Sequence, residues 1–249
     1  MMGMAPCRGW PRLLLLLLPL LGGAGAAWAG AFSVSPIRVD LSARHVVEAL
    51  TVHNVGDAAT LVQLDVVAWS QHDGKNVYLP STDLLATPPI FTVAAGATQV
   101  VRVGLRRGVD ARSELTYRVY LQEVAPAPKP GFQGLQVALR IGVPVFVAPV
   151  APAAPVLHWR AQAAGAGELR LTLANDGAMH TRISGLTLAQ GATPALTKAA
   201  PAYVLAGQRV SWKIGMAVAP GAPLRLGADS DAGPLHADLT LEPDGPAAP

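Results

Sequence analysis

Few side chains in this sequence stand where they could do acid–base, nucleophilic or metal chemistry. The 249 residues hold one cysteine, Cys7, and six scattered histidines. No two histidines have the spacing that puts two metal ligands on one element, and no H-E-x-x-H motif occurs. The sequence also has no G-x-S-x-G turn, P-loop or dinucleotide fingerprint. We therefore expect a protein that is not an enzyme and that needs no cofactor.

Two weaker constellations could hold a metal ion. Met179 and His180, with Met216, offer the thioether and imidazole ligands that suit copper. Isolated methionine and histidine side chains, however, more often serve packing or lie on the surface. Asp229-Ser230-Asp231 places two carboxylates close together, but other oxygen ligands at calcium-loop offsets are missing. We expect packing or surface roles for the first group, a solvated turn for the second, and no metal site.

The N-terminus has the layout of a secretory signal peptide. Arg8 and Arg12 precede and open a short leucine-rich run, and Ala27-Trp28-Ala29 forms an A-x-A-like cleavage site. The apolar run is too short to span a bilayer, so we expect no stable membrane insertion. The alternative is an uncleaved membrane anchor, but no long hydrophobic stretch with flanking charges supports it. We expect residues 1–29 to direct export and then to be removed.

Cleavage after Ala29 would change the charge and the cysteine content. It would leave 220 residues with 17 basic and 16 acidic side chains and without Cys7. A balance so close to neutral gives no clustered positive surface of the kind that follows nucleic-acid phosphates. Zinc–thiolate sites, cysteine catalysis and disulfides are excluded, and a chain of this length can bury two adequate cores without them.

The remaining sequence predicts an all-β protein. Runs with period-two alternation are separated by turn-forming residues about every 8 to 12 positions, a pattern typical of β-sandwiches. Turn-formers lie, for example, at 54–57, 72–76 and 95–96. No convincing helical period occurs after the signal peptide. The alternating runs that predict strands in the first half of the chain are 49–54, 60–69, 98–105 and 115–121.

A second unit is expected after a proline-rich linker. Three prolines within residues 149–155 make this segment stiff. Four further runs predict strands at 168–175, 183–188, 208–216 and 235–241. The phrase Leu-Thr-Leu-Ala-Asn-Asp-Gly at 171–177 echoes Leu-Thr-Val-His-Asn-Val-Gly at 50–56, which suggests two sandwiches of related design. We therefore expect an N-terminal domain over 30–150 and a C-terminal domain over 151–249 that ends in a disordered tail from Pro243.

One run differs from the others in length. From Leu135 to Val147, seven alternate positions are aliphatic and would share one face of a strand. Pro144 lies within the run and cannot donate to a ladder, which favours an edge strand or a bulge. A long, exposed aliphatic edge invites aggregation unless a partner covers it. The alternative is a core strand of the first sandwich that runs on into the linker.

Several phrases resemble the periplasmic pilus-assembly chaperones of the PapD-like family, in the order in which that family has them. The first is Phe-Ser-Val-Ser-Pro-Ile-Arg-Val at 32–39, and the second is Ala-Thr-Pro-Pro-Ile-Phe-Thr-Val-Ala-Ala-Gly at 86–96, where the family commonly has one cis X-Pro bond. The third is Leu-Gln-Val-Ala-Leu-Arg at 135–140, which is similar to the subunit-binding strand, and the fourth is Leu-Ala-Asn-Asp-Gly at 173–177. The likeness to this family extends over nearly all of the chain after the signal peptide.

The resemblance implies a fold, a location and a function. It implies two immunoglobulin-like sandwiches in the periplasm that bind fimbrial (pilin) subunits and deliver them to an outer-membrane usher. The subunits lack a strand, and the chaperone supplies it by donor-strand complementation. By resemblance, Arg38 holds the C-terminal carboxylate of the subunit. Side chains that match or continue the donor pattern are Leu135, Val137, Leu139, Ile141 and Val143.

The sequence departs from the better-known members of this family at one position. They have a lysine where this chain has Pro144, and that lysine helps to hold the subunit carboxylate. The phrase Val-Pro-Val-Phe-Val at 143–147 instead resembles the archaic branch, associated with spore-coat U-type subunits. We expect a second arginine to replace the lysine. The candidates are Arg118, which we rank first, and Arg140, which would lie roughly 13 Å back along the strand.

A different binding function remains open. A periplasmic immunoglobulin-like protein or adhesin could recognise a ligand other than a fimbrial subunit. A carbohydrate-binding adhesin would be expected to present aromatic platforms, yet aromatic residues make up only 5% of the chain.

Overall fold

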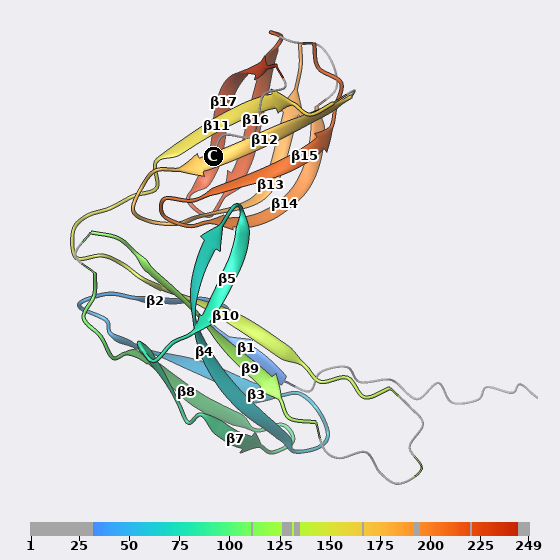
Figure 1. Cartoon of the computed structure of the whole chain (residues 1–249). Coiled ribbons are helices and arrows are strands. Elements are labelled where there is room, and N and C mark those ends of the chain that lie inside the picture. Colours follow the sequence, from blue (N-terminus) through green and yellow to red (C-terminus); the bar gives the residue numbers. More distant parts are fainter. Residues whose placement is uncertain are drawn as a thin grey trace, which may run out of the picture.

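The computed structural model describes residues 32–110, 112–125, 131, 135–165, 167–191, 195–219 and 221–243. The predicted signal peptide and most of the predicted tail lie outside these residues. The described residues form seventeen strands and contain no helix that could cross a membrane. The predicted all-β class with two sandwich domains is confirmed (Figure 1).

The N-terminal sandwich consists of two sheets. The first has the order β1-β3-β8-β6, and the second has the order β2-β10-β9-β4-β5, with β7 paired to β4. Alternate side chains from both sheets meet in one core that includes Leu50, Val101, Val119 and Val145. The strands are β1 (Phe32–Ser35), β2 (Val39–Leu41), β3 (Val47–Asn54), β4 (Thr60–His72), β5 (Lys75–Pro80), β6 (Leu84–Thr87), β7 (Ile90–Val93), β8 (Thr98–Leu105), β9 (Leu115–Glu123) and β10 (Arg140–Val147).

The C-terminal sandwich encloses a separate core. Its strand order is β14-β13-β16-β17-β11-β12-β15, and β11 and β17 are joined by a parallel pairing of only two residues each. Leucines on alternate positions of β12 and β13 are fully buried between the layers. The strands are β11 (Leu157–Ala163), β12 (Glu168–Asn175), β13 (Thr181–Ala189), β14 (Leu196–Val204), β15 (Arg209–Gly215), β16 (Pro223–Ser230) and β17 (Gly233–Glu242).

The similar sequences at 50–56 and 171–177 form the same hydrogen-bonded strand end in both domains. Asn54 and Asn175 end β3 and β12, and both side chains are fully buried. Each amide donates to backbone carbonyl groups, and each side-chain oxygen accepts from the amide of the glycine two residues on. A buried asparagine needs all of these partners, because an unpaired polar group in the core is costly. The sequence echo therefore reflects a shared way of closing one end of each sandwich.

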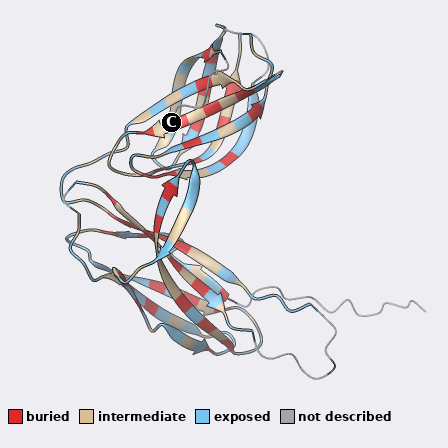
Figure 2. Cartoon of the chain, viewed as in Figure 1, coloured by how far each residue is buried: buried red, intermediate tan, exposed pale blue. Residues whose placement is uncertain are grey.

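The β4–β5 hairpin joins the two domains by reaching across to the second one (Figure 1). Trp69 on β4, Phe146 on β10 and Leu205 after β14 form a small buried cluster between the domains. The amide of Gln71 donates to the Tyr203 carbonyl, and its oxygen accepts from the Leu205 amide. Figure 2 shows a buried segment on the β4 arm of this hairpin. The hairpin fixes the second domain through both apolar and polar contacts.

The long aliphatic run is only partly a strand. β10 begins at Arg140, and residues 135–139 lie outside regular structure. The last backbone bond to β9 runs from the Glu123 amide to the Leu139 carbonyl, after which the Val124 amide bonds Leu61 on β4 instead. The Val124 bond continues the pairing of β9 with β4, and among the described residues the β9–β10 ladder ends at Leu139. The prediction of one strand from Leu135 to Val147 was wrong for its first five residues.

Candidate functional site

A row of outward-facing residues crosses three neighbouring strands of the second sheet. Val145 on β10 pairs with Val39 on β2, which places Arg38 beside Pro144. Pro144 in turn pairs with Arg118 on β9. Val39 and Val119 are buried, so both arginines point to the opposite, outer side. We call Arg38, Pro144 and Arg118 the Pro144 row; its two arginines are two strand spacings apart, or about 10 Å.

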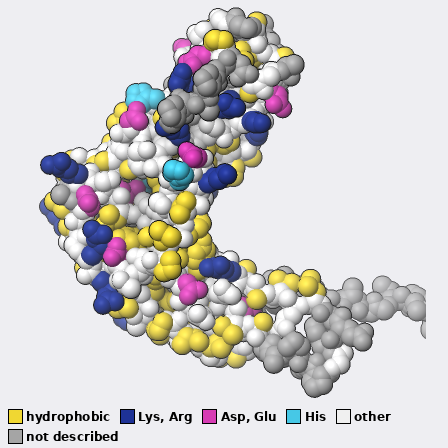
Figure 3. Space-filling model, viewed as in Figure 1, with side chains coloured by type: hydrophobic (Ala, Val, Ile, Leu, Met, Phe, Trp, Pro, Cys, Tyr) yellow, Lys and Arg dark blue, Asp and Glu magenta, His cyan; other side chains and the backbone are white. Residues whose placement is uncertain are grey.

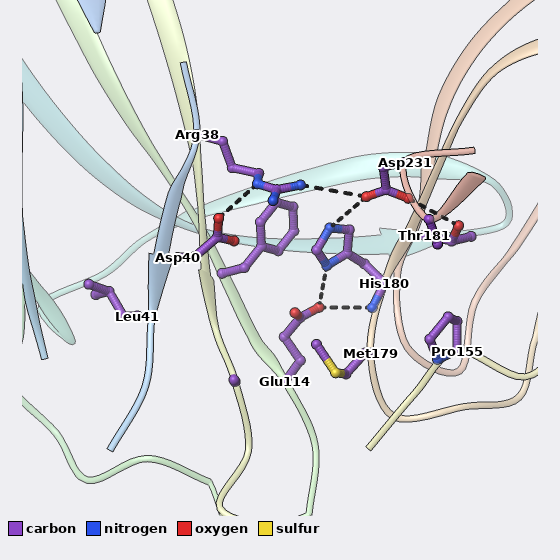
Figure 4. A pocket seen from close by; sticks show the side chains of 12 residues that line it. Arg38, Asp40, Leu41, Glu114, Pro155, Met179, His180, Thr181 and Asp231 are labelled. Carbon is purple, nitrogen blue, oxygen red and sulfur yellow. Dashed lines mark hydrogen bonds and ion pairs between the residues drawn. The ribbon is translucent and has the colours of Figure 1, made fainter. Parts of the chain in front are cut away.

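Arg38 already has acidic partners. Its Nε donates to Asp40 at 2.9 Å, and its Nη1 lies 3.6 Å from Asp231 of the C-terminal domain (Figure 4). The side chain is half-exposed, so these pairs contribute little to stability. A carboxylate that approached Arg38 would have to compete with Asp40 and Asp231.

Arg118 has a different environment. Its guanidinium group lies over the rings of Trp69, 4.5 Å from the centroid, and of Tyr78, at 5.4 Å. Its Nε is buried without a hydrogen-bond partner, and no carboxylate among the described residues lies within ion-pair distance. Burial raises the pKa of the Tyr78 phenol, and the positive charge of Arg118 opposes part of that shift. A buried donor on a cation that lacks an acidic partner is the arrangement that would gain most from an incoming anion.

Arg140 lies further along β10 and is exposed. Its guanidinium group stacks on Tyr120 at 3.9 Å, and Tyr120 meets Tyr78 edge-to-face at 6.0 Å. Tyr78 and Tyr120 therefore link Arg140 to Arg118 across the sheet. The structure brings Arg38 and Arg118 together around Pro144, whereas Arg140 belongs to the neighbouring aromatic group.

Gly142 leaves the space that these side chains fill. A Cβ atom at this position would lie 2.8 Å from Cε1 of Tyr120 and 3.1 Å from Cδ of Arg118. Both side chains therefore cross directly over the backbone of β10. A glycine at an outward position within a strand is a sequence signal of such a close approach, although it does not say which residue approaches.

The predicted donor side chains differ in their exposure. Leu135 and Val137 are 88% and 54% exposed, whereas Leu139 and Ile141 are partly buried against the N-terminal core. Val143 is only 1% exposed. In the chain alone, β10 completes its own sandwich and Val143 faces the core. Here the alternative reading of a core strand describes the chain better.

The outer edge of β10 is open over part of its length. Among the described residues, β2 covers only Val145, Phe146 and Val147, so residues 140–144 are paired on the β9 side alone. We call residues 135–144 the open edge. Figure 3 shows hydrophobic side chains gathered in the inner corner of the bent molecule, between the two domains. An extended segment of another chain could pair with this edge.

A pocket of about 420 Å³ lies between the domains beside the Pro144 row (Figure 4). His180 Nδ1 lies 2.8 Å from Glu114 Oε2, which also accepts from the His180 backbone amide. The His180 ring stacks on Phe146 at 3.5 Å, and its Nε2 lies 3.7 Å from Asp231. His180 and Glu114 are buried, with side chains 7% and 1% exposed. This polar cluster joins the domains behind Arg38.

Two predictions from the sequence concern residues of this cluster. Asp231 lies in the exposed turn between β16 and β17, as predicted, and its carboxylate also contacts Arg38 and accepts from the Arg182 amide. His180 packs against Phe146, and packing was one of the two roles predicted for this histidine. In the described part of the chain, no group of three His, Cys, Asp or Glu side chains could hold a metal ion. Sequence reasoning missed Glu114 and Trp69, whose partners lie far away in the chain.

Comparison with known proteins finds a family match for the N-terminal sandwich. Residues 31–153 match the family model of the pili and flagellar-assembly chaperones, PapD N-terminal domain. This sandwich belongs to the PapD-like chaperone family. Its predicted proline-paired turn contains the cis bond Thr87–Pro88, and a second cis bond precedes Pro36. No curated protein matches the chain.

Solved structures extend the likeness to both domains. A chain of the CsuC–CsuE chaperone–tip adhesion subunit pre-assembly complex, from archaic Csu pili of Acinetobacter baumannii, is 22% identical; the match covers 85% of this chain and 99% of that one, with a TM-score of 0.66. The E. coli chaperone DraB is 21% identical over 85% and 98% of the chains, with a TM-score of 0.60. A chain of the SafA pilin–SafB chaperone complex of Salmonella enterica is 19% identical over 85% and 98%, with a TM-score of 0.59. At these identities the likeness shows the two-domain fold.

Proposed function

We propose that this protein is a periplasmic chaperone that captures fimbrial subunits by donor-strand complementation and delivers them to an outer-membrane usher. The observation that carries the proposal is the open edge of β10 beside the Pro144 row, in a domain of the chaperone family. Solved structures that resemble the chain include complexes of a chaperone with a pilin and with a tip adhesion subunit. The activity is binding and release rather than catalysis.

The open edge would supply the strand that a subunit lacks. Backbone groups of residues 135–144 would pair with the subunit, and this pairing is independent of side-chain identity. Leu135 and Val137 are free to enter an apolar groove, and Leu139 and Ile141 would extend the contact. Each buried aliphatic side chain would contribute about 1.5–3 kcal/mol before the costs of association.

The Pro144 row would set the register by holding the C-terminal carboxylate of the subunit. Arg118 is the stronger anchor of the two arginines, because it has no acidic partner among the described residues and its Nε is unpaired. Arg38 would join it after exchanging Asp40 or Asp231 for the new carboxylate. The phrase Val-Pro-Val-Phe-Val at 143–147 and the likeness to a chaperone of archaic Csu pili support assignment to the archaic branch.

The proposal includes processing and domain organisation. Residues 1–29 would be removed after export to the periplasm, residues 30–150 would form the subunit-binding domain, and residues 151–249 the second domain. Usher delivery follows from the proposed family function.

Subunit capture tests the proposal. The chaperone would be coexpressed in the periplasm with a tagged fimbrial subunit from its own gene cluster and copurified. We expect Leu135→Glu/Val137→Glu to lose the complex, because charge in an apolar groove costs several kcal/mol. Val150→Glu is the control, since Val150 is also exposed but lies outside the open edge. Capture that survives the double substitution, in a protein with an unchanged melting temperature, would refute the proposed edge.

A further inference from the structure

A second cluster of polar and charged side chains lies on the C-terminal domain, on the outer face of β11, β12 and β15. On the middle row of this face, Arg160 pairs with Thr172, which pairs with Ser211. On one side of that row Arg170 lies opposite Lys213, and on the other side Arg209 lies opposite Ala174. Leu169, Leu171 and Leu173 of β12 are buried, so the residues between them point outward. The cationic side chains therefore surround a centre of small ones.

These residues form a hollow of about 440 Å³, which we call the β12 hollow. Its floor is made of Thr172, Ala174 and Ser211, and the two hydroxyl oxygens lie 2.8 Å apart. Arg160, Arg170 and Arg209 line its walls. The hollow is shallow because short side chains alternate with long ones across three strands.

The tip of the β4–β5 hairpin closes one end of the hollow. Asp73 and Gly74 line it, and a Cβ atom on Gly74 would lie 3.5 Å from the Arg209 carbonyl oxygen. The carboxylate of Asp73 is 84% exposed and lies 3.3 Å from His72 of the same turn. The hollow is therefore completed only when the two domains are docked through this hairpin.

The positive charge in the hollow exceeds the negative charge. Arg160 is paired with Glu242 at 2.6 Å. For Arg170 and Lys213, in contrast, no carboxylate of the described residues lies within ion-pair distance. Among the described residues, Asp73 is the single acidic side chain that lines the hollow, and Glu242 pairs with one of the three arginines from outside it. Arg170 and Arg209 lie on fixed strands beside two hydroxyl groups, and such an arrangement attracts an anion with several acceptor oxygens; Arg160 would join them by exchanging Glu242 for the anion.

We propose that the β12 hollow binds a phosphate-class oxyanion, carried either by a free phosphate or by the headgroup of an anionic lipid. Guanidinium groups match the geometry of phosphate oxygens with two parallel donors. Thr172 and Ser211 are bonded to each other, so one of the two hydroxyl groups keeps its proton to donate from below. The three walls come from three different strands, so a tetrahedral anion would contact all of them. None of these residues belongs to the open edge or the Pro144 row, so this site stands or falls independently of the proposed function.

Binding would be measured with the mature full chain in two arms. In the first, inorganic phosphate and pyrophosphate are titrated while the backbone amide NMR signals of Thr172 and Ser211 are followed. In the second, the protein is sedimented with vesicles of phosphatidylglycerol and, for comparison, of phosphatidylcholine. Arg170→Gln/Arg209→Gln is the test variant, and Arg102→Gln, an exposed arginine on β8, is the matched control. Melting temperatures establish that each variant is folded.

Saturable shifts with either phosphate, or sedimentation with phosphatidylglycerol but not phosphatidylcholine, support the site and identify the source of the anion. The test variant should weaken that binding by at least about 10-fold, since two charge-assisted contacts are lost, and the control should leave it unchanged. Absence of binding in both arms, or equal loss in the control variant, would overturn the proposal.

Discussion

At the scale of single residues, the structure distinguishes between the two arginines that could join Arg38 in binding the subunit carboxylate. Arg118 and Arg140 were both candidates from sequence, and only Arg118 lies in register with Pro144. Its guanidinium group is held on two aromatic rings, and its Nε has no partner among the described residues. An arginine held in this way loses little side-chain freedom when an anion arrives.

Arg118→Ala should weaken subunit binding by about 10-fold or more, because a hydrogen bond to a charged group is worth about 1.5–3 kcal/mol. Arg140→Ala should have a smaller effect, since Arg140 is exposed and distant from Pro144. Affinities of the purified chaperone for its subunit, measured side by side, provide the comparison. Equal losses for the two variants would remove the preference for Arg118.

Gly142 offers a second test at this scale. Gly142→Ala should displace the Tyr120 or Arg118 side chain, which the new methyl group would otherwise meet at 2.8 and 3.1 Å. We expect weaker subunit binding and a change in stability of no more than about 1 kcal/mol if the side chains move outward. Gly108→Ala is the control, because its methyl group would meet nothing within 4 Å. Unchanged affinity in Gly142→Ala would show that this arrangement is unimportant for binding.

At the scale of elements, period-two alternation located strands well where it was strong. The strands at 98–105 and 168–175 have the predicted bounds, because buried and exposed side chains alternate cleanly along them. β14 was missed because it is rich in small and polar residues, and Pro201 is tolerated there since β14 lies at the edge of its layer. β10 began later than predicted because strand length depends on the partner β9, which the sequence of β10 does not contain.

The buried asparagines at the ends of β3 and β12 allow a prediction for each domain. Asn54→Ala should destabilise the N-terminal domain by about 2–3 kcal/mol, because backbone groups in the core lose their partners. Asn175→Ala should affect the C-terminal domain in the same way. Urea unfolding followed by amide signals from each domain would separate the two effects. A loss of less than about 0.5 kcal/mol, typical of surface substitutions, would contradict this role.

At the scale of the whole molecule, the arrangement of the domains depends on contacts that no local pattern predicts. Arg38, Glu114, His180 and Asp231 come from four distant parts of the chain and meet in one cluster. Gln71 at the β4–β5 hairpin bonds two backbone groups of the second domain. The sequence indicated two sandwiches and a stiff linker, but the docking of one on the other emerges only from the folded structure.

Gln71→Ala should loosen that docking, because the Leu205 amide and the Tyr203 carbonyl lose their partner. We expect a larger radius of gyration in small-angle X-ray scattering and two separate thermal transitions in place of one. Gln99→Ala, at a partly exposed strand position of the N-terminal domain, is the control, since its amide bonds only the neighbouring Val100 carbonyl of its own strand. A variant with the scattering profile of the parent would show that the apolar cluster of Trp69, Phe146 and Leu205 is sufficient.

The central claim is that the open edge of β10 is completed by a strand of a fimbrial subunit, and amide hydrogen exchange measures this directly. Exchange would be followed by mass spectrometry for the free chaperone and for its complex with the subunit. We predict that residues 135–143 exchange rapidly in the free protein and become strongly protected in the complex, because their backbone groups gain a second hydrogen-bonded neighbour. Protection that appears elsewhere while residues 135–143 exchange as before would contradict the account.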